Sequence, residues 1–175
     1  MRLRRARGVA IGAPWAPVAA QLCFVAGEGA GKPLRFDARS APETGKHCDA
    51  LIRVIGLNAE AEMRFGESIA LVGPAAQIAP LDRAGETTGI AVLLKTLRVQ
   101  SYDPSLFTAL GIDPVAQNIV VIRSTNHFCA AFAPIASEVL YCGAGKPYPN
   151  IPAPNPYRLV RADIWPRMDD PFGEM

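Results

Sequence analysis

The sequence predicts a mixed α+β domain of the broad α/β class, with a mixed, largely antiparallel sheet and short flanking helices. Half of the 175 residues are hydrophobic, which is enough for one core. Alternating and β-branched runs fill the middle of the chain, as in strands joined by tight turns. Short segments that begin with proline and end at glycine are typical of brief helices.

The first part of the chain is predicted to be a strand end near Val9, a turn, and a helix that begins at Pro17. Val18, Leu22 and Val25 recur at spacings of four and three, and Gly27 suits the C-terminal cap. Ala16 stands at the N-cap, where the lack of a polar side chain costs about 1 kcal/mol.

The middle of the chain is predicted to be antiparallel. Residues 34–57 and 60–73 carry strand-like runs, broken at Pro-Glu-Thr-Gly (42–45) and Gly-Glu (66–67). Residues 87–99 are expected to continue the same sheet.

Two Asp-Pro pairs, Asp103-Pro104 and Asp113-Pro114, predict two short helices, each capped by its aspartate, with Gly111 ending the first. Residues 119–122 then read as a buried strand and 123–127 as a turn. A further helix is expected to follow, bent or ended by Pro134, with a stripe at Phe128, Ala131, Phe132 and Ile135.

Residues 137–142 are predicted to return to strand. Residues from about 143 to 175 form a proline-rich tail, with Tyr148, Tyr157 and Trp165 as expected anchors onto the domain surface. No internal repeat or long linker divides the sequence, so residues 1–175 are expected to be one domain.

Charge argues against a polyanion partner. The net charge of +2 depends on four arginines at positions 2, 4, 5 and 7, without which 14 basic residues stand against 16 acidic ones. We therefore expect no nucleic-acid binding. The N-terminal arginines and following apolar stretch imitate a secretion signal, but Pro14, Pro17 and Trp15 interrupt it, which favours a cytoplasmic protein. No stretch is long and apolar enough for a membrane span.

Cys23, Cys48, Cys129 and Cys142 lack the spacing of a metal site, and the chain has only two histidines, His47 and His127. Buried free thiols in a reducing compartment are the simplest interpretation, and we expect no metal site made by this chain alone. Residues 27–33, GEGAGKP, lack the spacing of a phosphate-binding loop, so a helix cap and turn explain these glycines better.

The strongest candidate site is the turn from Arg123 to His127, just after a strand and just before a helix. Backbone amides and the helix dipole favour a negative group there. Arg123 supplies a fixed charge, Ser124 and Asn126 can donate hydrogen bonds, and His127 can donate or accept near neutral pH. We predict substrate binding by these four residues, with His127 the one catalytic candidate. In the competing interpretation Ser124 or Asn126 caps the helix and His127 is simply half-buried.

The segments FTALGIDPVAQNIVVIRSTNHFCAAFAPIASEVLY and YRLVRADIWP resemble the C-terminal domain of the microcystinase C (MlrC) family of zinc metallopeptidases. The LGIDP turn, the family's K-S-x-x-H-F signature and the A-F-x-P-I-A helix carry the likeness, which extends over nearly the whole chain. Arg123 stands where the family usually has lysine, which keeps the charge but changes the donor geometry.

The resemblance implies an MlrC C-terminal-like fold and a hydrolase that acts on linear peptides, including opened microcystin. It also implies a zinc ion held by Asp and His residues of an N-terminal domain, which precedes the matched segment in the family. We therefore expect a substrate-cleft domain that is incomplete at its N-terminus, from a truncated or split protein, and inactive alone. The alternatives are a non-catalytic binding or oligomerisation module that pairs with a separately encoded half or with itself, and a decayed gene product.

Overall fold

The computed structural model describes residues 8–36, 48–124 and 126–142, together with residues 159, 161–165, 167, 168, 170 and 173. Its centre is a six-stranded sheet in the order β2-β3-β4-β5-β1-β6. Pairing is antiparallel from β2 to β5, whereas β1 runs parallel to both β5 and β6. The predicted mixed, largely antiparallel sheet with short flanking helices is thus confirmed.

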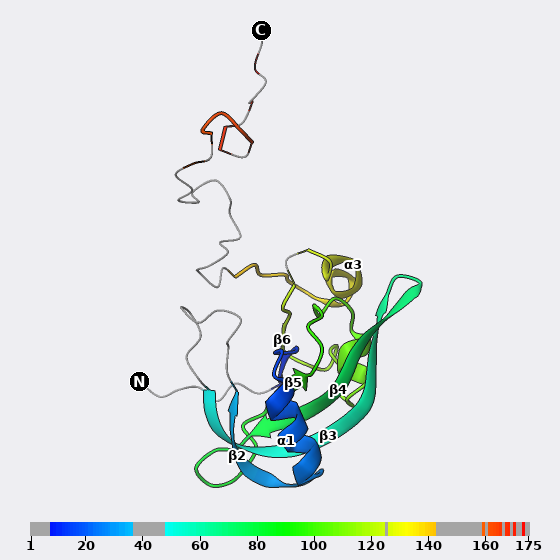
Figure 1. The fold of residues 1–175 in the computed structure, drawn as a ribbon, viewed down its shortest axis with the longest axis vertical. Coiled ribbons are helices and arrows are strands. Elements are labelled where there is room, and N and C mark those ends of the chain that lie inside the picture. Colours follow the sequence, from blue (N-terminus) through cyan, green and yellow to red (C-terminus); the bar gives the residue numbers. More distant parts are fainter. Residues whose placement is uncertain are drawn as a thin grey trace.

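The antiparallel half is built from β2 (Gly31–Phe36), β3 (Cys48–Phe65), β4 (Ser68–Pro80) and β5 (Ile90–Lys95). The long hairpin of β3 and β4 turns at Gly66, whose φ of 61° suits a residue without a side chain. Register shifts near Gly56 and Ala61 mark irregularities along β3. Such irregularities bend strands, and Figure 1 shows this hairpin curving across the molecule.

The parallel half consists of β5, β1 (Val9–Ile11) and β6 (Ile119–Val121). Val9 pairs with Ile90 on one side and with Ile119 on the other, so the carboxyl ends of all three strands meet at one edge of the sheet. Gly12 follows β1 where the chain passes the buried ring of Phe107. A Cβ at Gly12 would lie 2.4 Å from the Cζ atom of that ring, so this position requires glycine.

Two apolar cores cover opposite faces of the sheet, because side chains alternate along β5. Val92 and Leu94 belong to a core under α1 (Pro17–Ala26), whereas Leu93 belongs to a core with α2 (Ser105–Thr108) and α3 (Cys129–Phe132). The chain after β1 therefore passes over one face, and the chain after β5 passes over the other.

Helix α1 begins and ends where the sequence predicts, with Gly27 at φ 81° and its amide bonded to the carbonyl oxygen of Cys23 (2.9 Å). No side chain caps its N-terminus at Ala16. Its buried face consists of the small residues Ala19, Ala20 and Cys23. The stripe of larger side chains points outward, with Val18 69% and Val25 85% exposed.

The predicted helix after Asp113 is wrong. The carboxylate Oδ1 of Asp113 accepts a hydrogen bond from the amide of Val115 (2.9 Å), and the chain then makes a turn and enters β6 at Ile119. The few residues between Pro114 and that strand cannot repay the cost of starting a helix. The helix predicted after Asp103 is present only as the single turn α2. The carboxylate of Asp103 accepts a hydrogen bond from the amide of Ser105 (2.8 Å).

Two strand predictions also need correction. The strand at 119–122 is present as β6, but it lies at the edge of the sheet, so Ile119 is 54% and Val121 41% exposed rather than buried. Residues 137–142 form no strand: Val139 packs against the α2–α3 core, and the ring of Tyr141 lies 5.8 Å from that of Phe128. This segment therefore runs beside the helices without strand pairing.

The remaining predictions concern the last helix, the tail and the thiols. Phe128 and Phe132 are buried, but the helix becomes a 3-10 turn, η1 (Ala133–Ile135), as expected from Pro134. Trp165 is 71% exposed, so the prediction that it anchors the tail is wrong. Tyr148 and Tyr157 lie outside the described residues. Cys23 is a buried free thiol as expected, whereas Cys48 and Cys142 are exposed. None of the helices in the described ranges has the length and apolar character needed to cross a membrane.

Candidate functional site

The predicted polar turn lies at the carboxyl end of β6, at the same edge as the ends of β5 and β1. Arg123, Asn126 and His127 are exposed and Ser124 is half-buried. Thr125 is outside the described residues. The turn thus presents a cation, an amide and an imidazole to solvent, as the sequence predicts.

Gln100, which the sequence did not single out, connects the turn to the segment that follows β5. The hydroxyl of Ser124 donates to the side-chain oxygen Oε1 of Gln100 (3.0 Å), and Nδ1 of His127 lies 3.4 Å from the same oxygen. If Nδ1 carries the imidazole proton, both groups donate to this oxygen, and Nε2 is left as the acceptor. Gln100 therefore orients the two polar side chains most able to take part in proton transfer.

Two aromatic rings also hold His127 in place. The imidazole meets the rings of Phe65 and Tyr102 edge-on, at centroid distances of 6.0 and 6.1 Å, and those two rings lie 4.8 Å apart. Phe65 is the last residue of β3 and Tyr102 follows β5 along the chain. The aromatic pair leaves His127 exposed while restricting its orientation.

The competing interpretation of the turn, in which Ser124 or Asn126 caps the helix, is wrong. Phe128 occupies the N-cap of α3, and no side chain bonds to the amides there. Asn126 contributes only its backbone carbonyl, which accepts from the amide of Cys129 (3.0 Å). The polar side chains of the turn are therefore not needed to begin the helix.

Lys95, the last residue of β5, is a second cation at this edge that sequence reasoning missed. It is only 3% exposed, and no ion pair or hydrogen bond of its ammonium group is found within the described residues. Burial disfavours the charged ammonium and the nearby Arg123 adds repulsion, which together lower the pKa of Lys95 to about 8. The sequence does indicate that Lys95 is buried, since this lysine ends the apolar run from Ile90.

The described donors do not fit a zinc ion. Within the residues that the structure describes, no three His, Cys, Asp or Glu side chains gather in one place. His127 contacts Gln100, and the thiol of Cys129 lies 2.9 Å from the hydroxyl oxygen of Tyr141. His47 lies outside the described residues.

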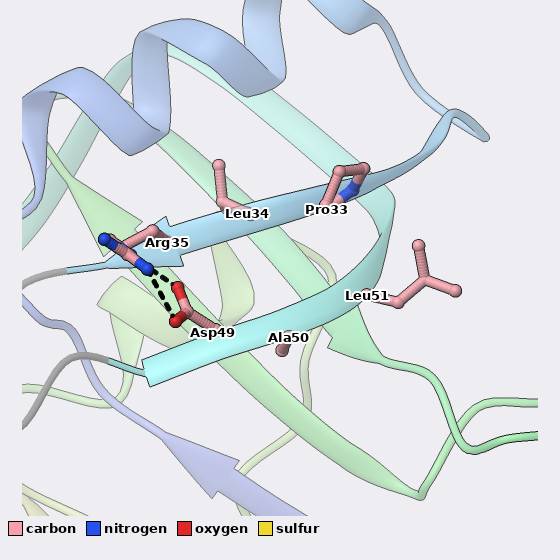
Figure 2. A pocket seen from close by; sticks show the side chains of 6 residues that line it. All are labelled: Pro33, Leu34, Arg35, Asp49, Ala50 and Leu51. Carbon is pink, nitrogen blue, oxygen red and sulfur yellow. Dashed lines mark hydrogen bonds and ion pairs between the residues drawn. The ribbon is translucent and has the colours of Figure 1, made fainter.

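Neither of two surface hollows is lined by a residue of the polar turn. The first lies at the β2–β3 edge, lined by Pro33, Leu34, Arg35, Asp49, Ala50 and Leu51. Figure 2 shows that the guanidinium of Arg35 crosses it to bind both carboxylate oxygens of Asp49, at 2.6 and 2.8 Å. The second hollow is lined by Glu62, Met63, Arg64, Ile69, Ser105, Thr108 and Ala109. Neither contains a residue of the predicted site.

Comparison with known proteins places the chain in a family. Residues 1–158 match the model of the MlrC C-terminus. A microcystinase C from Sphingomonas sp. is 27% identical over 136 residues, which are 78% of this chain and 25% of that protein. The chain therefore spans about a quarter of the length of this relative.

A solved structure shares the fold. A protein from Mesorhizobium sp. BNC1, described as a metallopeptidase, aligns with a TM-score of 0.60 at 23% identity. The alignment covers 75% of this chain and 26% of that one. The resemblance inferred from the sequence motifs and the fold that it implied are both confirmed.

Proposed function

This chain belongs to the MlrC C-terminal family, and we propose that it is the substrate-cleft domain of a zinc metallopeptidase that acts on linear peptides. The observation that carries the proposal is the polar turn from Arg123 to His127. It lies at the edge where three parallel strands end, its side chains face solvent, and contacts with Gln100 and two aromatic rings position His127.

The turn offers groups that suit a peptide backbone. Arg123 can attract a carboxylate or a polarised carbonyl oxygen, and Asn126 can donate to a peptide carbonyl. His127 can exchange a proton through Nε2 while Nδ1 stays on Gln100. These roles bind and orient a substrate, and they require no metal ligand from this chain.

The zinc ion is proposed to be held by polypeptide outside these 175 residues. Support comes from the described donors, which do not gather into a site, and from the relatives, of which the chain covers about a quarter. When bound, zinc supplies a Lewis acid and lowers the pKa of a coordinated water. The chain alone is then inactive.

The test combines this chain with the remaining part of a family member that carries the zinc ligands. With zinc and a linear peptide, we expect turnover by the mixture and none by the chain alone. His127→Ala should lower kcat at least about tenfold in the mixture, as for loss of a proton-transfer group. Arg83→Ala, at an exposed turn, is the matched control and should leave it unchanged. Zinc-dependent turnover by this chain alone would contradict the proposal.

A non-catalytic pairing module is the second candidate, favoured by the outward face of α1. Val18, Leu22 and Val25 are 69%, 41% and 85% exposed, as expected of a surface that another chain covers. The same mixing experiment separates the two candidates, because a module would bind the metal-bearing part, or itself, without restoring turnover.

A further inference from the structure

The carboxyl ends of β5 and β1 have the topology of a ligand site. These neighbouring strands are parallel, and the chain leaves β1 over the face covered by α1 but leaves β5 over the face covered by α2 and α3. Open α/β sheets bind ligands at such a point, where connections from adjacent strands diverge. Lys95 is the residue at the end of β5.

The surroundings of Lys95 are positively charged. Arg123 lies at the same edge, two residues past the end of β6, and its charge disfavours the protonated form of Lys95; Arg98, three residues along the chain from Lys95, lies over the ring of Trp15 at 5.9 Å. Two ion pairs of the described residues lie elsewhere, between Arg35 and Asp49 and between Arg161 and Asp163. A buried ammonium beside other cations is costly unless an anion joins it.

The segment that follows β5 carries a buried hydroxyl between two residues that contact His127. The hydroxyl of Ser101 is fully buried and has no partner in the described structure, although its neighbours Gln100 and Tyr102 both contact His127. The backbone of Lys95 also adjoins the start of α1, since its carbonyl oxygen accepts from the amide of Ala16 (3.0 Å).

We infer that the carboxyl edge of β5, β1 and β6 is a carboxylate-binding site, with Lys95 and Arg123 as its cations. A carboxylate gives the buried ammonium a partner and is matched by the planar guanidinium of Arg123. That the carboxylate belongs to a peptide substrate rests on the proposed function. The binding of a carboxylate at this edge does not depend on the proposed function.

The test follows Lys95 directly by NMR in the full chain, labelled with ¹³C at lysine Cε, where the sequence has only four lysines. The probe is N-acetylglycine, and its uncharged amide is the matched control compound. At saturation we expect N-acetylglycine to shift the Lys95 resonance and to raise its pKa from about 8 by about one unit, and the amide to do neither.

Two variants make the assignment specific. Lys95→Met keeps the length of the side chain without its charge and should weaken N-acetylglycine binding by about tenfold or more, the loss expected for one charge-assisted contact. Lys32→Met, a lysine on β2 whose ammonium donates to the carbonyl oxygen of Leu22 (3.4 Å), should leave binding within about twofold. Thermal melting of both variants checks that they are folded.

The two sources of a carboxylate are separated by repeating the titration with the metal-bearing part of the family protein bound. If an acidic side chain of that part fills the site, Lys95 titrates near its ordinary value and ignores N-acetylglycine; if a ligand fills it, the low pKa and the response persist. The inference is overturned if Lys95 neither responds to N-acetylglycine nor changes its pKa in either setting, or if Lys95→Met binds like the wild type. If N-acetylglycine binds but the mixture of the two protein parts does not hydrolyse the peptide, the proposed function is wrong and the carboxylate site stands.

Discussion

The two halves of the sheet differ in how their charged groups are satisfied. In the antiparallel half, Arg35 and Asp49 face each other on paired strands at the surface and form a two-pronged ion pair. At the end of the parallel half, Lys95 is buried, lies near Arg123 and has no ion pair within the described residues. The first arrangement pairs its charges within the chain, whereas the buried cation of the second leaves room for an additional group, which is why we propose the parallel edge as the functional one.

The largest expected effect is on the pH dependence of stability. Lys95 has a pKa of about 8 when folded, against an ordinary value of 10.5, so between these values the unfolded chain binds a proton that the folded chain does not. Stability therefore rises as pH increases from about 8 to 10.5, by at most about 3 kcal/mol.

The measurement is the urea midpoint at pH 8 and pH 10 for the wild type and for Lys95→Met. Burial raises the pKa of the Cys23 thiol, which removes stability as pH increases, so the difference between the two proteins isolates Lys95. If the wild type and Lys95→Met respond equally to pH, the lowered pKa of Lys95 does not account for the pH dependence of stability.

The next effect tests the close packing of the parallel half. Gly12→Ala should destabilise the fold by about 2 kcal/mol, because its Cβ would overlap the fully buried ring of Phe107. The matched control is Gly31→Ala in the antiparallel half, where the nearest atom to a new Cβ is 3.9 Å away. Chemical denaturation of both variants gives the comparison, and equal losses would contradict it.

A smaller effect is expected at Gln100. Gln100→Leu removes the oxygen shared by Ser124 and His127 and should cost about 1 kcal/mol or less, since these groups are partly solvated. NMR relaxation should show greater motion of the His127 ring. Gln21→Leu, at an exposed position of α1, serves as the control. An unchanged His127 ring would mean that the aromatic contacts alone hold it.

The smallest effect is expected in the antiparallel half. Arg35→Ala breaks an ion pair whose side chains are 63% and 59% exposed, so the loss should be about 0.5 kcal/mol and should shrink in high salt. Urea unfolding at low and high salt checks this. A loss comparable to that from Gly12→Ala would remove the contrast between the halves.

The antiparallel half could be predicted from sequence because its signals are local. Alternation along β3 and β4 and the turn at Gly66 lie within one stretch of chain. The parallel pairing of β1 with β5 and β6 joins residues about 80 and 110 positions apart, as in Val9 with Ile90 and Ile119, and no local pattern encodes it. The exposure of β6 was mispredicted for the same reason, since an edge position is a property of the whole sheet.

The candidate site also has a part that local sequence predicts and a part that depends on long-range contacts. The polar residues Arg123, Ser124, Asn126 and His127 are consecutive or nearly so, and the sequence predicts their shared location. Gln100 and Lys95 were missed because they reach the turn from another part of the chain.

The small side chains under α1 have a consequence for local unfolding. The helix rests on the sheet through Ala19, Ala20 and Cys23, while Val18, Leu22 and Val25 point away from it. Lifting the helix exposes these small side chains and the sheet residues beneath them, such as Val92 and Leu94, but leaves the strand pairing intact, so it requires less free energy than separation of β3, β4 and β5. Amide hydrogens of α1 should therefore exchange with solvent earlier than those of the sheet, and a chain bound over its outer face would slow them.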